Sequence, residues 1–120
     1  MSAGLTSRPL ADVRVLDLSR LLPGPFATLV LADLGAKVDK IEDPGQGDYL
    51  RHMPPQVGGQ NVAFSILNRG KRSGVLDLKR PEGQQALAAI VGTYDVLFEQ
   101  FRPGVLGRLG LAPEALRDRK

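Results

Sequence analysis

The sequence predicts an α/β protein whose mainly parallel sheet is flanked by helices. Three observations support this fold class: apolar runs of strand length, helical patterns that begin at prolines, and a regular alternation of the two along 120 residues. Strand, helix and strand follow one another at the start of the chain, which is the order of a βαβ unit. Such units are right-handed, so ligands are expected beyond the carboxyl ends of the strands.

The first βαβ unit opens the chain. A nearly continuous apolar run at 13–18 has the length of a buried strand. Pro25 fits the first turn of a helix over 26–34, because a proline there loses no hydrogen bond, and Gly35 ends that helix. The segment 36–42, in which polar and apolar residues alternate, is the second predicted strand.

The rest of the chain continues the alternation. Glycines and prolines interrupt 46–60, which predicts a long loop before a short apolar piece at 62–67. A third strand is expected at 74–78, a helix that begins with a proline at 81–91, and a fourth strand at 94–99. The last predicted elements are a short helix after Arg102-Pro103-Gly104 and a helix from Pro113 to Lys120.

The composition argues against several classes of protein. The chain has no cysteine and one histidine, His52, so neither a zinc site nor a disulfide framework is expected, and this lone loop histidine is given no catalytic role. The net charge is only +3, and the basic run 69–72 has no interleaved aromatic residue, which argues against nucleic-acid binding. No signal peptide or membrane-spanning stretch is recognisable. We therefore expect a cytoplasmic protein.

Chemically distinctive loops follow all four predicted strands, where they should meet at one edge of the sheet. Free amides at the start of the helix after Pro25 predict a phosphate site, and strand-end cations add positive charge to it. A polyanionic ligand is therefore expected. The loops are 22–25, 42–45, 79–80 and 101–104, and the cations are Lys79, Arg80, Arg102 and Arg108.

Two common nucleotide-binding motifs are absent. Although Glu42 ends the second strand, where a ribose-binding acid is found in dinucleotide-binding proteins, the turn after the first strand lacks the G-x-G-x-x-G pattern. The segment 68–73 lacks the first glycine of a P-loop, so NTP hydrolysis is not predicted. Asp17, Asp77 and Asp95 are expected to have structural roles: Asp95 should cap the turn before its strand, and the other two should accept N–H groups of nearby loops.

Taken in order, the motifs of the chain resemble those of the class III coenzyme A transferases, a family that also includes the α-methylacyl-CoA racemases. The resemblance extends from about Pro9 to Arg117. The matching motifs are Leu10–Leu18, Gly24-Pro25, Leu31–Ala36, Lys40-Ile41-Glu42, Gly47-Asp48, Asn68–Ser73, Leu76–Lys79 and Arg102–Val105.

The resemblance implies a Rossmann-like large domain that binds CoA, a smaller domain formed by later sequence, and an interlocked homodimer of the full-length protein. Residues 1–8 are then a flexible N-terminus, and residues 9–120 are the N-terminal portion of the large domain, ending before the catalytic region. The family's catalytic groups, an Asp in transferases and a His and an Asp in racemases, come later in the sequence. No catalytic residue is therefore assigned to this chain.

The resemblance also implies ligand contacts. No permanently bound cofactor is expected, because CoA and acyl-CoA are substrates, together with carboxylic acids. Asp43 stands where many relatives have an arginine that helps to hold the nucleotide. The implied CoA-binding residues are Leu21, Leu22 and Pro23 at the nucleotide entrance, Leu76, Asp77, Leu78 and Lys79 at the adenine and phosphates, Gln100, Phe101 and Arg102 along the CoA arm, and Arg108 at a phosphate.

Three functions remain open at this point. A transferase would move CoA from an acyl-CoA to a carboxylic acid through an aspartyl intermediate. A racemase would instead remove and replace the proton on the carbon next to the thioester carbonyl, and the patterns at 21–25 and 42–45 are slightly closer to racemase-like members. A small α/β nucleotide-binding module without catalysis is the third.

Overall fold

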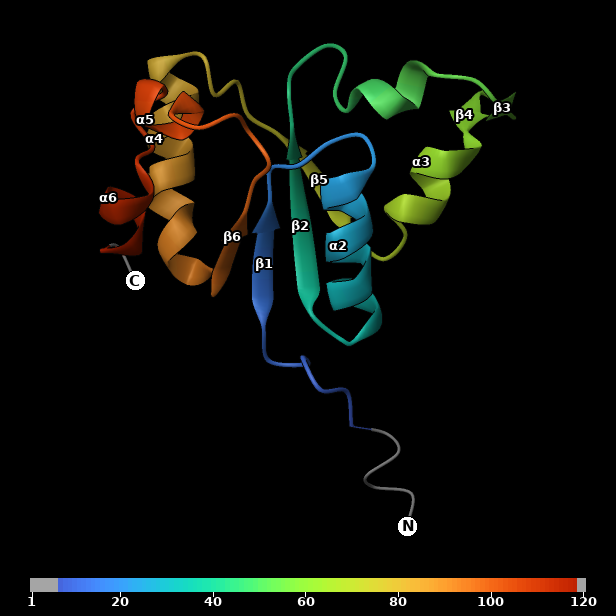
Figure 1. Cartoon of the computed structure of the whole chain (residues 1–120), viewed down its shortest axis with the longest axis horizontal. Coiled ribbons are helices and arrows are strands. Elements are labelled where there is room, and N and C mark those ends of the chain that lie inside the picture. The colour runs from blue at the N-terminus through green and yellow to red at the C-terminus, as the bar shows by residue number, and fades with distance from the viewer. Residues whose placement is uncertain (1–6, 119–120) are drawn as a thin grey trace.

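The chain folds around a four-stranded parallel sheet with the strand order β5-β2-β1-β6 (Figure 1). This computed structural model describes residues 7–118, so most of the expected flexible N-terminus at 1–8 lies outside the described residues. The predicted fold class is confirmed. The strands of the sheet are β1 (Arg14–Asp17), β2 (Lys37–Glu42), β5 (Arg72–Val75) and β6 (Val96–Phe98).

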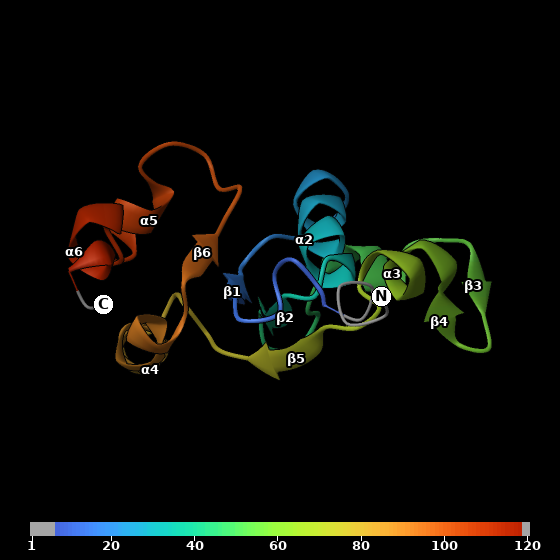
Figure 2. The same cartoon turned by 90° about the horizontal axis from the view of Figure 1, so that it is seen from below.

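The two faces of the sheet bury different side chains, because neighbouring residues of a strand point to opposite sides. On one face, Val15 and Val38 pack against Leu31 of α2 (Pro23–Asp33). On the other face, Leu16 belongs to a larger cluster with buried leucines of the C-terminal helices. Figure 2 shows α2 and α4 on opposite sides of the sheet. The C-terminal helices are α4 (Pro81–Ile90), α5 (Val105–Arg108) and α6 (Pro113–Arg117).

Helix α2 connects β1 to β2 and forms the predicted βαβ unit with them. It begins at Pro23, earlier than the predicted start at residue 26, because both Pro23 and Pro25 fit its first turn. The helix ends as expected. Gly35 adopts φ +109° and donates its N–H to the Ala32 carbonyl at 2.9 Å, a conformation that favours glycine.

The third strand differs from the prediction. It occupies 72–75 instead of 74–78, and its partner is β2. Arg72 fixes its start, because the guanidinium donates to both carboxylate oxygens of Asp39 at 2.7 and 2.8 Å. Leu78, which the apolar pattern placed in the strand, is buried in the cluster under the C-terminal helices. The apolar spacing thus reflected packing against helices, not continuation of the strand.

The prediction of a long loop without structure at 46–60 is also wrong, because about half of the segment forms regular structure. A short 3₁₀ helix, η1, is followed by a hairpin of two antiparallel strands, β3 and β4. Gly58 and Gly59 form its turn with φ 60° and 81°, the backbone that a two-residue type I′ turn requires. These elements are η1 (Tyr49–His52), β3 (Gln56–Val57) and β4 (Gln60–Asn61), and α3 (Val62–Leu67) covers the short apolar piece.

The C-terminal part follows the expected order. The fourth strand is present as β6, and a 3₁₀ turn, η2 (Val91–Thr93), follows α4. The last helix is shorter than predicted, because α6 ends at Arg117 and Asp118 caps it, while residues 119 and 120 lie outside the described residues. Within residues 7–118, no helix has the length and apolar character needed to cross a bilayer.

The close packing of α4 on the segment after β5 leads to a stability prediction. A methyl group on Gly83 would collide with the Asp77 carbonyl. Gly83→Ala should therefore lower the free energy of unfolding by about 1–3 kcal/mol, although alanine is the better helix former. Gly107→Ala on α5, where the added methyl meets no atom within 4 Å, should be neutral or stabilising. Urea unfolding followed by circular dichroism measures both, and equal effects would contradict this packing.

Candidate functional site

Loops from distant parts of the sequence meet at the carboxyl ends of the strands, as the sequence predicts. Gln100, which follows β6, accepts a hydrogen bond from the Gly24 N–H at 2.8 Å and donates one to the Arg20 carbonyl at 2.6 Å. The Arg20 guanidinium pairs with Asp43, which follows β2, at 2.9 Å. The loops after β1, β2 and β6 are therefore joined directly, and we call this end of the sheet the strand-end site.

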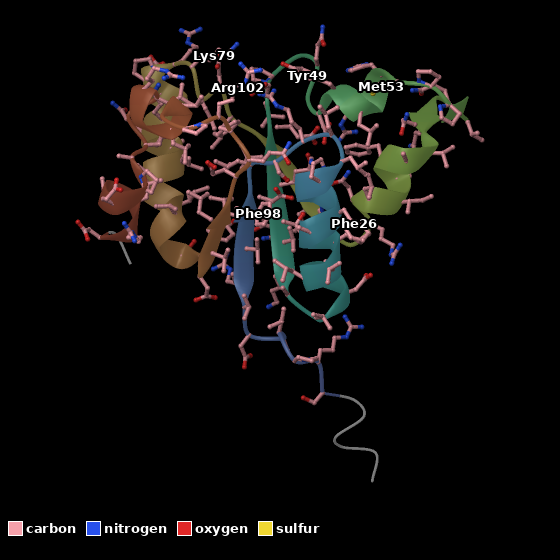
Figure 3. All side chains as sticks on the ribbon, viewed as in Figure 1. Phe26, Tyr49, Met53, Lys79, Phe98 and Arg102 are labelled. Carbon is pink, nitrogen blue, oxygen red and sulfur yellow. The ribbon has the colours of Figure 1, made fainter. Side chains whose placement is uncertain are left out.

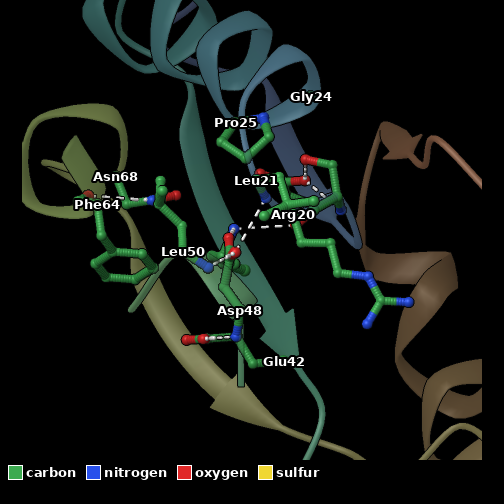
Figure 4. Close-up of polar contacts among 12 residues, drawn as sticks. Arg20, Leu21, Gly24, Pro25, Glu42, Asp48, Leu50, Phe64 and Asn68 are labelled. Atoms are coloured by element: carbon green, nitrogen blue, oxygen red, sulfur yellow. Dashed lines mark hydrogen bonds and ion pairs between the residues drawn. The ribbon is translucent and has the colours of Figure 1, made fainter. Parts of the chain in front are cut away.

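A buried ion pair underlies the strand-end site, and Figure 4 shows its acidic member, Asp48, between Leu21 and Leu50. The Lys40 Nζ lies 2.8 Å from the Asp48 Oδ2, and the two side chains are 1% and 0% exposed. Lys40 also donates to the Ser19 carbonyl at 3.0 Å. The other Asp48 oxygen accepts the N–H groups of Leu21 and Leu50, each at 3.0 Å. One carboxylate thus links β2, the loop after β1 and the 3₁₀ helix η1.

This pair holds Leu21 in a strained conformation. In the part of the chain that the structure describes, Leu21 is the one residue other than glycine with a positive φ, of 68°. Left-handed backbone costs an L-residue roughly 1–2 kcal/mol, so surrounding contacts must maintain it. The hydrogen bond from the Leu21 N–H to Asp48 is such a contact. It orients the loop that leads into α2 and leaves the Leu22 side chain 61% exposed.

Glu42, at the end of β2, is the most strongly perturbed carboxylate described. Arg51 donates to both of its oxygens at 2.8 and 2.7 Å, Ser73 donates to Oε2, and the Asp48 N–H donates at 2.7 Å. Burial opposes ionisation of Glu42, but these hydrogen bonds outweigh burial and lower its pKa to about 2. Glu42 is therefore an ionised structural anchor and not a proton donor at neutral pH.

A second buried lysine contacts the start of α2. The Lys71 Nζ donates to the Pro25 carbonyl at 3.0 Å and to the Asn68 side chain at 2.9 Å, and lies 3.5 Å from Asp17. Burial lowers the pKa of Lys71 to about 8, although the negative charge of Asp17 raises it. Asp17 also accepts the Thr28 hydroxyl at 2.6 Å. These contacts attach α2 to the end of β1.

Asp17 and Asp77 accept the N–H groups of nearby loop residues, Ser19 and Lys79, as expected, and Asp95 accepts an N–H group of another strand. Asp17 is fully buried and holds α2 as described above. Asp77 accepts the Lys79 N–H at 3.1 Å, and Asp95 accepts the Arg14 N–H at 2.9 Å, at the opposite end of the sheet. Each carboxylate therefore satisfies a backbone group that the strands leave unpaired.

The predicted phosphate site at the start of α2 is wrong. Pro23 and Pro25 have no N–H group to offer, and the Gly24 N–H already donates to Gln100. The Phe26 N–H donates to a carbonyl at the start of the helix, at 3.0 Å. The first turn of α2 therefore presents no free amide to a ligand.

Two pockets open at the strand-end site. Lys79 lines the outer pocket, of about 360 Å³, and Leu78 and Phe101 line the inner pocket, which is narrow, of about 20 Å³. Asp43 borders both. The outer pocket is lined by Asp43, Pro44, Gln46, Tyr49, Asp77 and Lys79, and the inner pocket by Leu18, Ser19, Arg20, Ile41, Glu42, Asp43, Gly47, Asp48, Leu78 and Phe101.

The structure brings only some of the implied CoA-binding residues together. Figure 3 shows Lys79 and Arg102 at the same end of the molecule, near Tyr49. Arg102 and Arg108 are exposed and line neither the outer nor the inner pocket. The remaining residues differ in burial. Leu76 and Leu78 pack on the core, Leu21, Asp77 and Phe101 are half-buried, and Leu22, Pro23 and Gln100 are exposed.

Sequence reasoning missed Arg20 and Tyr49. The Arg20 guanidinium lies 4.7 Å from the centre of the Tyr49 ring and 6.0 Å from that of Phe101, within the range of cation–π attraction. Arg20 follows the first strand closely, so its position alone could have identified it. Lys40 was assigned to a strand, and Lys71 to a basic turn, without their buried acidic partners, which are distant in sequence.

Metal chemistry has little support in the described residues. Between residues 7 and 118, no three His, Asp or Glu side chains gather as metal ligands. The His52 Nε2 lies 2.7 Å from the Gln46 carbonyl and is exposed. The polar groups of the strand-end site are amides, carboxylates and cations, and of these the exposed cations Arg20 and Lys79 suit an anionic organic ligand.

The parallel sheet, its helical layers and the strand-end pockets define a Rossmann-like α/β protein. Comparison with known proteins identifies its family. The chain belongs to the CoA-transferase family III, whose family model matches residues 10–120.

Relatives with assigned activities cover the chain well. It is 50% identical over 109 residues to an acetyl-CoA:oxalate CoA-transferase of Acetobacter aceti, and the aligned residues make up 90% of this chain and 28% of that protein. It is 43% identical over 108 residues to the human succinyl-CoA:glutarate CoA-transferase, covering 89% and 25%. The chain therefore spans about a quarter to three tenths of the length of these relatives.

Solved structures show the same fold. A hypothetical protein of Mycobacterium tuberculosis superposes with a TM-score of 0.87 at 41% identity, covering 95% of this chain and 31% of that one. A CAIB/BAIF family protein of Brucella suis gives a TM-score of 0.86 at 37% identity, covering 96% and 32%. The α/β sheet described here is thus part of a larger fold in both neighbours.

The low pKa of Glu42 predicts how stability depends on pH. Because the folded pKa, about 2, lies below the usual 4.5, the stabilisation is complete above about pH 4.5 and is lost as the pH falls toward 2. Glu42→Gln should lower the free energy of unfolding by about 3 kcal/mol at neutral pH and by little near pH 2. Urea titrations at several pH values measure the difference. The exposed Glu114→Gln is the control, and a Glu42→Gln loss that persists near pH 2 would contradict the assignment.

The strain at Leu21 predicts an unusual preference for glycine. Leu21→Gly and Leu21→Ala remove nearly the same side chain, but only glycine adopts a φ of 68° without steric cost. The glycine variant should therefore be more stable than the alanine variant by about 1 kcal/mol. Thermal or urea unfolding of the two proteins measures this difference. Greater stability of the alanine variant would show that Leu21 does not hold the left-handed conformation in solution.

Proposed function

We propose that this chain forms the CoA-binding part of an enzyme that transfers CoA between an acyl-CoA and a carboxylic acid. The observation that carries the proposal is the family match over residues 10–120, together with relatives that are CoA-transferases for oxalate and glutarate. These relatives favour transfer over racemisation. The substrates are therefore an acyl-CoA and a free carboxylic acid, with no permanently bound cofactor.

The nucleotide part of CoA is proposed to lie at the strand-end site. The outer pocket supports this, because Lys79 supplies a cation and Tyr49 an exposed ring beside a space of about 360 Å³. Phe101 and Leu78 provide apolar contact in the inner pocket. The proposed contacts are those implied by the resemblance: Leu21–Pro23, Leu76–Lys79, Gln100–Arg102 and Arg108.

The chemical steps are proposed to use an aspartate outside residues 7–118, as in the family that the sequence resembles. Its carboxylate would attack the thioester carbonyl, form a mixed anhydride and release the CoA thiolate. The thiolate would attack the enzyme's carbonyl of that anhydride and free the acyl group as a carboxylate. The acceptor carboxylate then repeats the exchange in reverse order, so bonds formed and broken balance. The described residues would bind and orient the CoA.

A homodimer of the full-length protein is part of the proposal. Apolar side chains lie exposed at every fourth position along α2 and its ends, and therefore share one face of the helix. Such a stripe favours association with another surface. The residues are Leu22, Phe26, Val30 and Leu34. We also propose a cytoplasmic location, as expected for a chain without cysteine.

Two substitutions test the proposed phosphate contacts. Lys79→Ala and Arg108→Ala should each weaken CoA binding by about 1–3 kcal/mol, the scale of a lost charge-assisted hydrogen bond. Isothermal titration of CoA into the protein measures both. Lys37→Ala removes an exposed lysine at the opposite end of β2 and should leave the affinity unchanged. Unchanged affinity in both site variants would refute the contacts, and absence of CoA binding to the unmodified protein would refute the function.

A further inference from the structure

The ion pair between Arg20 and Asp43 occupies the boundary between the two strand-end pockets. Asp43 borders both pockets, and Arg20 borders the inner one. Their side chains are 32% and 41% exposed, so solvent reaches the pair. Lys79 faces the same outer pocket. An anion that enters there meets Lys79 and the carboxylate of Asp43, whose ion-pair partner Arg20 lies on the inner-pocket side.

The pair is built so that the guanidinium can change partners while its backbone stays in place. The Arg20 carbonyl is held by Gln100, and the residue that follows it is held by Asp48. Tyr49 and Phe101 lie at 4.7 and 6.0 Å and limit where the guanidinium can move. Only the Nη1 atom is bonded to Asp43, at 2.9 Å, so the contact is not bidentate.

Charge favours exchange of Asp43 for a phosphate. A half-exposed ion pair contributes little net stability, because water and salt compete with both partners. A phosphate or diphosphate carries more charge than a carboxylate and accepts two parallel hydrogen bonds from one guanidinium. The free energy lost on opening the pair is therefore small relative to that gained with the new partner.

We infer that Arg20 is a phosphate-binding residue of the strand-end site and that Asp43 competes with the ligand for it. This inference rests on the proposed function and names a contact that sets CoA affinity. The ligand group is a phosphate or diphosphate ester. Asp43 offsets the positive charge of the site when it is empty and weakens binding, which speeds release of the acyl-CoA product.

A double-mutant cycle tests the competition. Arg20→Met should weaken CoA and ADP binding about tenfold. Asp43→Asn should strengthen it about threefold in the otherwise unmodified protein and leave it unchanged when Arg20 is already Met. The control is the exposed pair Arg69 and Asp33, joined at 2.8 Å away from both pockets, whose Arg69→Met and Asp33→Asn variants should change neither affinity. All four single-substitution sites are solvent-accessible, and thermal unfolding confirms that each variant is folded.

Each outcome of the cycle decides the inference. If Asp43→Asn strengthens CoA binding equally in the unmodified protein and in the Arg20→Met variant, Asp43 acts only through its electrostatic field. That result would overturn the proposed competition for Arg20. An Arg20→Met variant with unchanged affinity would overturn the phosphate contact. If the unmodified protein fails to bind CoA, the proposed function fails, and the Arg20 Nε–H resonance during an ADP titration decides the inference separately: a shift that Arg20→Met removes supports it, and no shift overturns it.

Discussion

The buried pair of Lys40 and Asp48 is the interaction on which the strand-end site depends. Two charges removed from water are costly unless both are paired and hydrogen-bonded, so the surroundings must hold them in one geometry. Here the partners of the pair are backbone groups of two separate loops. Loss of either charge would release the turn after β1 and the segment after β2 together. The strands fix where these loops begin, but the ion pair fixes their conformation.

Lys71 and Asp17 form a second buried pair of the same kind, where the end of β1 meets the start of α2. Lys40 extends from β2 and Lys71 from the turn before β5. Each contacts a carboxylate and donates to a backbone carbonyl. Neither lysine is free to contact a ligand, because both side chains are almost completely buried. The cations available to an anion are therefore the exposed ones, Lys79 and Arg20 among them. This separation of structural from accessible charge explains why counting basic residues in the sequence overstates the electrostatic attraction of the site.

Local sequence patterns were sufficient for most of the fold. The apolar run at 13–18 and the alternating pattern at 36–42 identified the central strands, and prolines marked the starts of α2, α4 and α6. The hairpin at 56–61 was missed although Gly58-Gly59 is a local signal for it, but the other failures at the site share one physical cause, which is long-range contact. The amides of α2 are unavailable because Gln100, 76 positions away, takes the one that the prolines leave. The pairs of Lys40 and Lys71 depend likewise on packing that no local pattern records.

The bidentate contact of Arg72 with Asp39 has a consequence for how the chain behaves in concentrated solution. β5 is a border strand, and its outer row of amides and carbonyls is a template on which a foreign strand can grow. β5 is only four residues long, and the side chain of its first residue, Arg72, is 79% exposed. The template is therefore short and carries a positive charge. Intermolecular strand pairing, the first step toward fibrous aggregates, is thereby discouraged where the sheet would otherwise invite it.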